Sequence, residues 1–443
     1  MIIKKILSAL LCAALLAVTL CACSEPGKFS DSELLSATRK RDSDVTKTFN
    51  YADGAKEPPT SYNSYANLIT GYELKLFRNI AAQDGAGGKS FVFSPAANTL
   101  DLSLLADGAK NDTLSEIILA LGSDLTIEDI NTCSSYFKSR METVSKSDSK
   151  SDDESHDNTN HIKFGNTLLI NDKTDVRTTF LQSNADYFSA DIARFDFSNK
   201  DNKDNVNNLL GSPAYDKLNL KEDGSVCGVT SFGLSDNWLT PYAGSAEVDS
   251  KFNGKASKFL TSNENYIHSD LAKGIIKYTA NNPLKLVLIM PNENVKIEDY
   301  VKTFDSVEYS KLLDSFSVTA RKDSCIPAFE IPKSDDPKPM SPVMIKSGLY
   351  TLFSDKSDFS NLAHTKNVEI NELYDLQPGI TLNRYGIFTS GEEVSQENIS
   401  STEKPTAAPE SSKAETLEFS RPFIFMLIDN ESNIPVYMGV YSS

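Results

Sequence analysis

Residues 401–415, STEKPTAAPESSKAE, form a polar stretch rich in Pro and Ser near the end of this 443-residue chain. It lies between two apolar segments, ITLNRYGIF (380–388) and FSRPFIFMLID (419–429). Both flanking segments have the β-branched and aromatic residues that are typical of buried strands. A Pro- and Ser-rich composition is typical of flexible linkers, but only enough chain for a hairpin follows it. The sequence therefore predicts a flexible segment between two strands of one core.

The composition indicates a globular protein that does not bind nucleic acid. Hydrophobic residues make up 40% of the chain, which is enough for a sizeable core. The formal net charge is −17, whereas binding to a phosphate backbone needs clustered Lys and Arg. We find no GxSxG, HExxH, GxxxxGKS/T or GxGxxG motif, and the chain has four histidines. No enzyme activity, metal site or cofactor is expected.

The N-terminus resembles a bacterial lipoprotein signal peptide. Lys4 and Lys5 precede an apolar run, residues 6–20, that is too short for a comfortable transmembrane helix. The run ends in Cys21-Ala22-Cys23, and Cys23 is the better site for lipidation because a small residue precedes it. We predict removal of residues 1–22 and a lipid anchor on Cys23 at the extracytoplasmic face of the cell membrane. Secretion without a lipid is the alternative.

Two further segments are predicted to be flexible, and the remaining cysteines to be buried. Residues 23–60 are expected to tether the anchor to a domain that spans 61–443, and the charged run 145–161 to form a surface insertion. Besides Cys23, the mature chain has three widely spaced cysteines, which fit neither a disulfide framework nor a CxxC metal site: Cys133, Cys227 and Cys325. We expect them to be buried thiols.

The hydrophobic pattern predicts helices in the first part of the domain and strands in the last part, which indicates an α+β fold. The expected helices are residues 65–80, 98–109 and 110–122, with Pro95 opening a helix after a short strand in 90–95. Asp112 or Thr113 is expected to cap the helix at 110–122. The expected later strands are residues 161–170, 228–238, 284–291, 315–320 and 326–332.

Three motifs in register resemble the serpin family of serine protease inhibitors, from about residue 62 to 443. The matching segments are FVFSPAANTLDLSLLADGAKNDTLSEI (91–117), SGLYTLFSDKSDFSNL (347–362) and the C-terminal segment 419–443. Trp238 falls where serpins have a tryptophan at the top of the central sheet. The matching residues are Phe93, Ser94, Pro95, Gly108, Ala109, Lys110, Thr113, Gly348, Leu349, Leu352, Phe353, Ser354, Asp358, Phe359, Ser360, Phe419, Arg421, Pro422, Phe423, Phe425, Met438 and Gly439.

The resemblance implies helices around a large central mixed or antiparallel sheet, with smaller sheets and an exposed reactive-centre loop at residues 391–418. A serpin is a suicide substrate: a protease cleaves the loop, which then inserts into the central sheet and distorts the acylated protease. Family spacing places the scissile bond near Ala407-Ala408, which suits elastase- or subtilisin-like serine proteases. The resemblance thus implies an extracellular protease as partner and a monomeric inhibitor.

The predicted hinge of the loop, GEEVSQE (391–397), departs from the small uncharged residues that insertion favours. Two registers remain open, because either Gly391 or Val394 stands at the hinge glycine, and each register buries a carboxylate, Glu392 or Glu397, at a cost of several kcal/mol. The predicted hinge residues are Gly391, Glu392, Glu393, Val394, Ser395 and Glu397.

The polar cluster expected behind Ser94 and Pro95 also departs from the family. Ala97 replaces a serine and Thr230 an asparagine, and the usual histidine has no counterpart, with Thr381 or Asn383 nearest. The alternative function is therefore a non-inhibitory serpin-fold protein that binds a ligand or partner at the surface. A solute-binding lipoprotein would fit the anchor but would leave the motifs unexplained.

Overall fold

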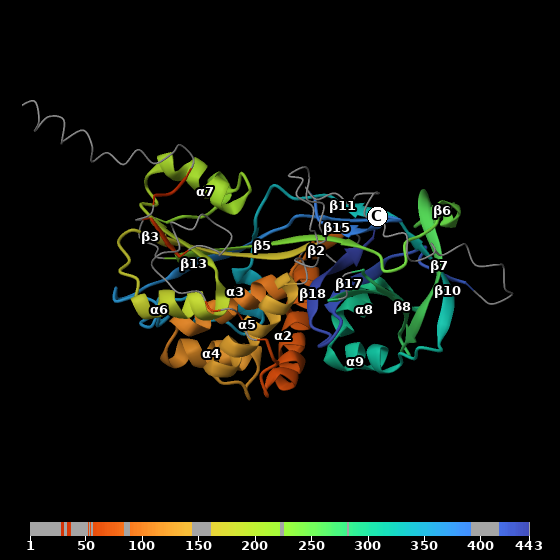
Figure 1. The fold of residues 1–443 in the computed structure, drawn as a ribbon, viewed down its shortest axis with the longest axis horizontal. Coiled ribbons are helices and arrows are strands. Elements are labelled where there is room, and N and C mark those ends of the chain that lie inside the picture. Colours follow the sequence, from red (N-terminus) through yellow and green to blue (C-terminus); the bar gives the residue numbers. More distant parts are fainter. Residues whose placement is uncertain are drawn as a thin grey trace, which may run out of the picture.

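Two nine-stranded β-sheets and a layer of helices make up the part of the chain that the computed structural model describes (Figure 1). The described residues are 28–30, 33–36, 52, 54, 56–83, 89–143, 161–221, 226–280, 283–390 and 416–442. The predicted α+β fold, with helices packed on a large mixed central sheet, is confirmed.

The central sheet has β5 in its middle, paired antiparallel with β3 from Val226 to Ser235. Its strand order is β1-β4-β3-β5-β15-β14-β11, and β13 pairs with both β5 and β12. Its strands are β1 (Leu34–Ser36), β3 (His161–Asn171), β4 (Asp191–Phe195), β5 (Val226–Asn237), β11 (Phe329–Ile331), β12 (Lys338–Pro339), β13 (Ile370–Leu376), β14 (Ile380–Leu382) and β15 (Gly386–Phe388).

The second sheet contains the most apolar strands of the chain. Every residue of the C-terminal hairpin β17–β18 is buried, because both faces of these strands are covered. The order is β16-β10-β7-β8-β9-β17-β18-β2, with β6 paired to β7. The strands are β2 (Phe91–Phe93), β6 (Glu247–Phe252), β7 (Lys255–His268), β8 (Ala272–Tyr278), β9 (Leu284–Pro291), β10 (Arg321–Pro327), β16 (Leu417–Glu418), β17 (Phe423–Asp429) and β18 (Pro435–Tyr441).

The helices lie mainly on one face of the central sheet, and α7 lies on the other (Figure 1). Helix α3 is buried along nearly its whole length, because it runs between this sheet and the other helices. The helices are α2 (Tyr62–Gln83), α3 (Pro95–Gly108), α4 (Asn111–Leu121), α5 (Ile127–Thr143), α6 (Thr178–Ser183), α7 (Lys203–Leu210), α8 (Ile297–Thr303), α9 (Ser306–Asp314) and α10 (Ser341–Lys346). A π-turn (Asn184–Phe188) and short 3₁₀ turns (Lys200–Asn202, Tyr215–Lys217, Gly244–Ala246) connect these elements.

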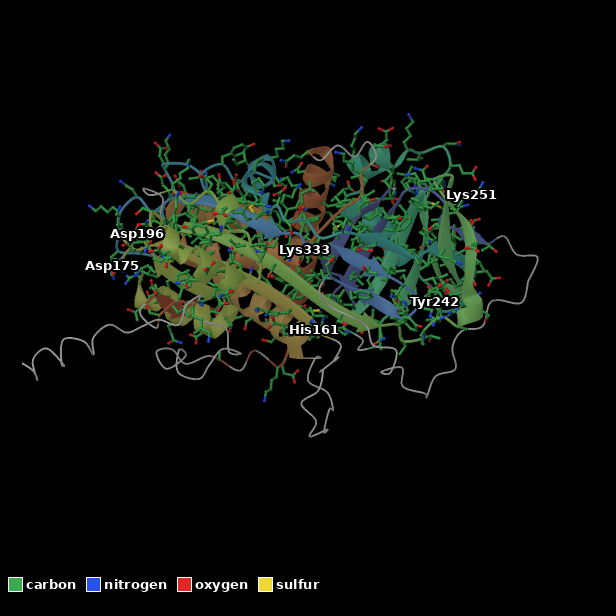
Figure 2. The ribbon with its side chains drawn as sticks, turned by 90° about the horizontal axis from the view of Figure 1, so that it is seen from above. His161, Asp175, Asp196, Tyr242, Lys251 and Lys333 are labelled. Carbon is green, nitrogen blue, oxygen red and sulfur yellow. The ribbon has the colours of Figure 1, made fainter. Side chains whose placement is uncertain are left out.

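Most of the predicted elements are confirmed, including the helix opened by Pro95 and the buried thiols of Cys133, Cys227 and Cys325. The predicted capping of α4 is wrong, because Lys110 occupies the N-cap position and makes no side-chain cap bond. The charged run ends one residue earlier than expected, since His161 is the first residue of β3 (Figure 2).

The predicted strand at residues 315–320 is wrong. Helix α9 ends at Asp314, and the chain then turns, with the Ala320 amide donating to the Ser317 carbonyl. Val318 is exposed, so its β-branched side chain does not pack in a sheet as the prediction assumed. The predicted strand at 326–332 is two strands, because the chain leaves one sheet as β10 and enters the other as β11. Residues 380–388 likewise form a hairpin, β14 and β15, rather than one strand.

Part of the predicted tether at residues 23–60 belongs to the folded domain. Strand β1 pairs antiparallel with β4 at the edge of the central sheet. Phe29 is buried, with its ring 5.1 Å from that of Phe195, in the apolar cluster that also contains Val206 of α7. The few apolar residues of this short segment are enough to dock it on the domain. The polar average composition of residues 23–60 gave no sign of this docking.

Replacing Phe29 with alanine is expected to destabilise the domain by about 2–3 kcal/mol, because it removes a buried ring. The midpoint of urea unfolding measures this change. Tyr350→Ala is the control, since Tyr350 is 65% exposed and its loss should cost under about 0.5 kcal/mol. Equal midpoints for the two variants would show that Phe29 does not dock in solution.

Candidate functional site

One edge of β5 is shared by two segments that run in opposite directions. β13 pairs with β5 in parallel along Val226–Ser231, and β15 pairs antiparallel along Ser235–Asn237. Between them, the Leu234 amide donates to Thr389 Oγ1 at 3.0 Å, and the Thr389 amide donates to the Leu234 carbonyl at 2.9 Å. The chain therefore turns back after β14 and enters the central sheet between β14 and β5.

The turn that reverses the chain is made by residues 383–386. Asn383 Oδ1 accepts hydrogen bonds from the amides of Tyr385, at 2.8 Å, and Gly386, at 3.2 Å. Such a side-chain acceptor stabilises a tight reversal. A Cβ atom on Gly386 would lie 2.2 Å from the Asp236 carbonyl oxygen, so any larger residue would separate β15 from β5.

Trp238 fixes the end of the sheet at which β15 enters. It follows β5 directly and is buried, and its indole Nε1 donates to the Asn383 carbonyl at 2.8 Å. Its backbone amide donates to the Tyr385 carbonyl at 3.0 Å. Both partners belong to the turn, so the tryptophan, which the resemblance placed at the top of this sheet, holds the β14–β15 hairpin.

A buried ion pair joins Trp238 to the second sheet. Lys277 Nζ of β8 donates to Glu264 Oε1 of β7 at 2.8 Å and lies 4.3 Å from the ring centroid of Tyr242. Burial lowers the pKa of Lys277, and Glu264 opposes this shift by stabilising the charged form. Figure 2 shows Tyr242 toward the end of the molecule formed by the second sheet, opposite Asp175 and Asp196.

The first turn of α3 lies beneath the pairing of β5 with β13, which we call the seam (Val226–Ser231 with Ile370–Leu376). Ser94 caps the helix by accepting from the Ala97 amide at 3.1 Å, and Pro95 fits the first helical position. Ser94 Oγ also donates to the Val436 carbonyl of β18 at 2.8 Å. These two residues therefore connect the helix to the second sheet.

Asp375, rather than Thr381 or Asn383, makes the polar contact from β13 to this turn. Asn98 Nδ2 donates to Asp375 Oδ2 at 3.1 Å, and both side chains are buried. The contact between β13 and the first turn of α3 is therefore made by a carboxyl group and an amide.

The two substituted positions of the cluster also have partners. The Ala97 carbonyl accepts from Asn166 Nδ2 of β3 at 3.0 Å. Thr230 Oγ1 donates to the Tyr374 carbonyl at 3.3 Å, across the seam. The strands on both sides of the seam are thus tied either to α3 or to each other.

The sequence could have shown some of these residues. Asn98 and Asp101 are polar residues one turn apart in a helix that is otherwise apolar enough for complete burial, a pattern that predicts an internal polar contact. The partners Asn166 and Asp375 carry no such signal, because strand pairing alone brings them there.

The other predicted site residues lie outside the described part of the chain, so their positions stay predictions. They are Ala407 and Ala408 of the reactive centre, the hinge residues 391–397 and the lipidation site Cys23. Of the predicted loop 391–418, only its end is described, where Leu417–Glu418 pair in parallel with β10.

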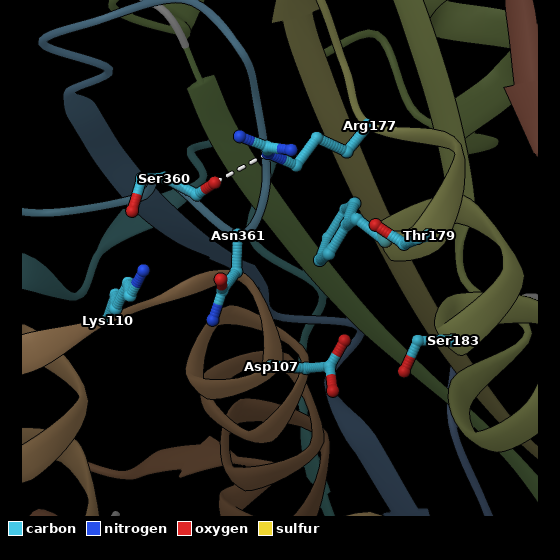
Figure 3. Close-up of a pocket in the computed structure, with 8 residues that line it drawn as sticks. Asp107, Lys110, Arg177, Thr179, Ser183, Ser360 and Asn361 are labelled. Carbon is cyan, nitrogen blue, oxygen red and sulfur yellow. Dashed lines mark hydrogen bonds between the residues drawn. The ribbon is translucent and has the colours of Figure 1, made fainter.

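A polar pocket of about 470 Å³ lies at the opposite end of α3 (Figure 3). Asp107 and Lys110 line one side and Arg177 the other, and Arg177 Nε donates to the Ser360 carbonyl at 2.6 Å. The pocket is open and does not border the seam. Among the described residues, no group of three or more His, Cys, Asp or Glu side chains could hold a metal ion, and no helix is long and apolar enough to cross a bilayer.

The fold is a helix-covered mixed sheet in which the chain turns back after β14 and pairs with the same edge of β5 as β13 does. The chain belongs to the serpin family, whose profile, described as Serpin (serine protease inhibitor), matches residues 68–443.

Relatives and solved structures agree with this assignment. An uncharacterized serpin-like protein of Methanosarcina acetivorans is 20% identical over 393 residues, covering 83% of this chain and 85% of the relative. The native state of tengpin, a thermophilic serpin, has a TM-score of 0.69 with 24% identity, covering 89% of this chain and 97% of tengpin. Human thyroxine-binding globulin has a TM-score of 0.68 with 16% identity, covering 86% and 98%.

The variant Gly386→Ala is expected to expel β15 from the sheet, because its Cβ would overlap the Asp236 carbonyl. Trp238, the single tryptophan of the chain, would lose its partners in the turn, so its fluorescence should shift toward that of an exposed indole.

Gly233→Ala is the matched control, because a Cβ there would meet only Lys163 Cβ at an ordinary 3.8 Å. If Gly386→Ala has the same emission spectrum as the parent protein, β15 does not depend on this close approach.

Proposed function

We propose that this serpin inhibits serine proteases as a suicide substrate, with residues 391–418 as the reactive-centre loop. Cleavage is proposed near Ala407-Ala408, after which the loop would extend β15 along β5. The observation that carries this proposal is the position of β15, which already lies antiparallel to β5 at the end of the seam. An inserting strand needs this orientation and this position.

Insertion along this path would replace the parallel seam with two antiparallel pairings. The added strand would form on the order of ten backbone hydrogen bonds, each with a net contribution of about 0.5–1.5 kcal/mol. Six residues of β5 from Val226 to Ser231 would have to separate from β13 first. The seam is therefore the barrier between the intact and the inserted state.

The register of β15 indicates which hinge side chains insertion would bury. Ile387 and Thr389 are buried on the inner face, whereas Phe388 between them is partly exposed. Because side chains alternate along a strand, residues 391, 393, 395 and 397 would follow on the inner face. Glu393 and Glu397 would then oppose insertion, and Gly391 and Ser395 would fit.

Features of the sequence support the location and targets that we propose for the inhibitor. A lipid on Cys23 would display the domain at the extracytoplasmic face of the membrane, where it would act as a monomer on extracellular proteases. A small residue at the cleavage site suits the shallow apolar pockets of elastase- and subtilisin-like enzymes. We propose neither a catalytic activity nor a cofactor for this chain.

A non-inhibitory function is the second candidate, and the two acidic residues expected to face inward favour it. Slow insertion would let the protease complete hydrolysis and leave a cleaved inhibitor. Human thyroxine-binding globulin, whose structure is similar to that of this chain, was solved in complex with thyroxine. A serpin-fold protein that binds a ligand or partner at the cell surface would not need its loop to insert.

Incubation of the full chain with an elastase- or subtilisin-type protease is expected to give a covalent complex that survives SDS. Sequencing of the released C-terminal fragment would locate the scissile bond. Thr389→Arg is the matched variant, because a charge at this buried position should stop insertion and leave only cleavage. Cleavage of the parent protein with full protease activity left would reject the inhibitory function.

Nicking the loop is expected to raise the thermal midpoint of the parent protein by tens of degrees, because insertion adds a strand to the central sheet. The double variant Glu393→Ala, Glu397→Ala should gain more in its thermal midpoint on nicking, since its inserted strand buries no carboxylate. Differential scanning calorimetry before and after nicking measures both effects. An unchanged midpoint in the parent and in the double variant would favour the non-inhibitory function.

A further inference from the structure

Two buried carboxyl groups lie beneath the seam, and the serpin resemblance assigns neither of them. The first is Asp101 of α3, which is 1% exposed. A Cβ atom on Gly228 of β5 would lie 2.7 Å from Asp101 Oδ2 and 2.5 Å from a methyl carbon of Leu373 of β13. The carboxyl group thus lies directly against the point where Gly228 and Leu373 are paired. Neither of its oxygens has a hydrogen-bond partner among the described residues.

The second carboxyl group is that of Asp375, two residues further along β13. Asp375 is paired with Thr230 across the seam, and its side chain points toward α3, where Asn98 donates to it. Two residues of a strand span about 7 Å, and residues two apart lie on the same face. Asp101 and Asp375 therefore form a pair of acids on the α3 side of the seam.

The groups around Asp101 do little to neutralise a negative charge. Burial raises the pKa of Asp101 to about 7, and the Asn166 side chain of β3, whose amide donates to the Ala97 carbonyl, lowers it in part. Cys227 of β5 has a pKa raised by burial and by the charges of Glu372 and Asp101, so it stays a neutral thiol. Glu73 of α2 accepts from Thr99 of α3 at 3.1 Å, and burial raises its pKa well above the usual value.

One cation faces Asp375 from the described part of the chain. Lys338 of β12, its strand partner, and the hydrogen bond from Asn98 both lower the pKa of Asp375. Burial outweighs them and raises that pKa to about 7. Tyr437 of β18 lies on the other side and is neutral, because burial and Asp375 raise its pKa well above 10. At neutral pH both acids are thus divided between the protonated and the ionised form.

We propose that Asp101 and Asp375 act as a proton-sensitive latch, in which the two protonated carboxyls hold the seam closed and their ionisation lets β13 separate from β5. As regulation of loop insertion, the latch rests on the proposed inhibitory function. Ionisation would place a negative charge on each acid in the interior, where α3, β5 and β13 pack around it and burying an uncompensated charge costs several kcal/mol. Separation of the strands admits water and relieves this cost.

The direction of the pH effect follows from the number of protons that each state binds. In the closed seam both pKa values are about 7, whereas an aspartate in water has a pKa of about 4. Between these values the closed state binds more protons, so opening becomes easier as pH rises through this window and changes no further well above pH 7. If opening restores the ordinary pKa, the opening constant rises about 30-fold for each acid between pH 5.5 and 8.5.

Hydrogen exchange of the full, uncleaved chain tests the latch without any protease. Exchange of the amides in Val226–Ser231 and Ile370–Leu376 is measured by mass spectrometry at pH 5.5 and 8.5 and corrected for the intrinsic rate at each pH. The amides of Phe423–Asp429 and Pro435–Tyr441, in the second sheet, serve as the internal reference. We expect the protection of the seam to fall by more than 10-fold at pH 8.5 while the reference changes little.

Two variants separate the latch from a general effect of pH. Asp101→Asn with Asp375→Asn mimics the protonated acids, so seam protection should equal the acid value at both pH values. Glu73→Gln is the matched control at a buried acid of α2 whose hydrogen-bond donor is Thr99 of α3 rather than a residue of β5 or β13, and it should keep the parent's pH dependence. Equal corrected protection of the parent seam at the two pH values would overturn the latch, whether or not the double variant folds.

The outcome of the exchange measurement does not depend on inhibition. A pH-dependent seam without an SDS-stable complex would retain the latch and reject the inhibitor, and the reverse result would reject the latch alone. If both hold, complex formation with one protease should be faster at pH 8.5 than at 5.5 in the parent, relative to the double variant at the same pH.

Discussion

The structure depends on one parallel pairing in its central sheet. β5 has a complete antiparallel partner in β3, but on its other edge the short parallel seam with β13 is followed by the antiparallel strand β15. Parallel pairing is slightly less stable per residue than antiparallel pairing. A chain segment that pairs antiparallel with this edge of β5 would therefore replace β13 there. β15 already pairs in this way at one end of the edge, along Ser235–Asn237.

Polar groups beneath the sheet hold β13 in its place beside β5. The first turn of α3 contacts β3 through Asn166, β13 through Asp375 and β18 through Ser94. A buried polar contact specifies one arrangement of strands more strongly than apolar packing does, because misplacing it leaves a desolvated group without a partner. At the other end, Trp238 holds the turn that admits β15, and Lys277 of the Lys277–Glu264 pair lies over the Trp238 ring.

The fold was largely predictable, because its decisive segments carry strong local signals. The largely apolar strands of the C-terminal hairpin, the helix begun by Ser94 and Pro95, and the motif around Gly348 can each be recognised from the sequence. The site was less predictable. Residues 386–389 return into the sheet because Gly386 lets two strands approach closely, and Asp375 meets Asn98 because of the strand register. Neither feature can be recognised from a short stretch of sequence. Segments with weak patterns, such as the turn at Val318 and the docked residues around Phe29, were assigned wrongly for the same reason.

If Cys23 carries the proposed lipid, the docking of Phe29 limits how far the domain can move from the membrane. Only five residues lie between Cys23 and Phe29, and the six Cα–Cα steps of a fully extended chain span about 20 Å. With a lipid on Cys23, the β1–β4 edge of the central sheet would stay within that distance of the bilayer surface. The domain would then present a fixed side to the membrane, and a protease could approach it only from the sides that face away.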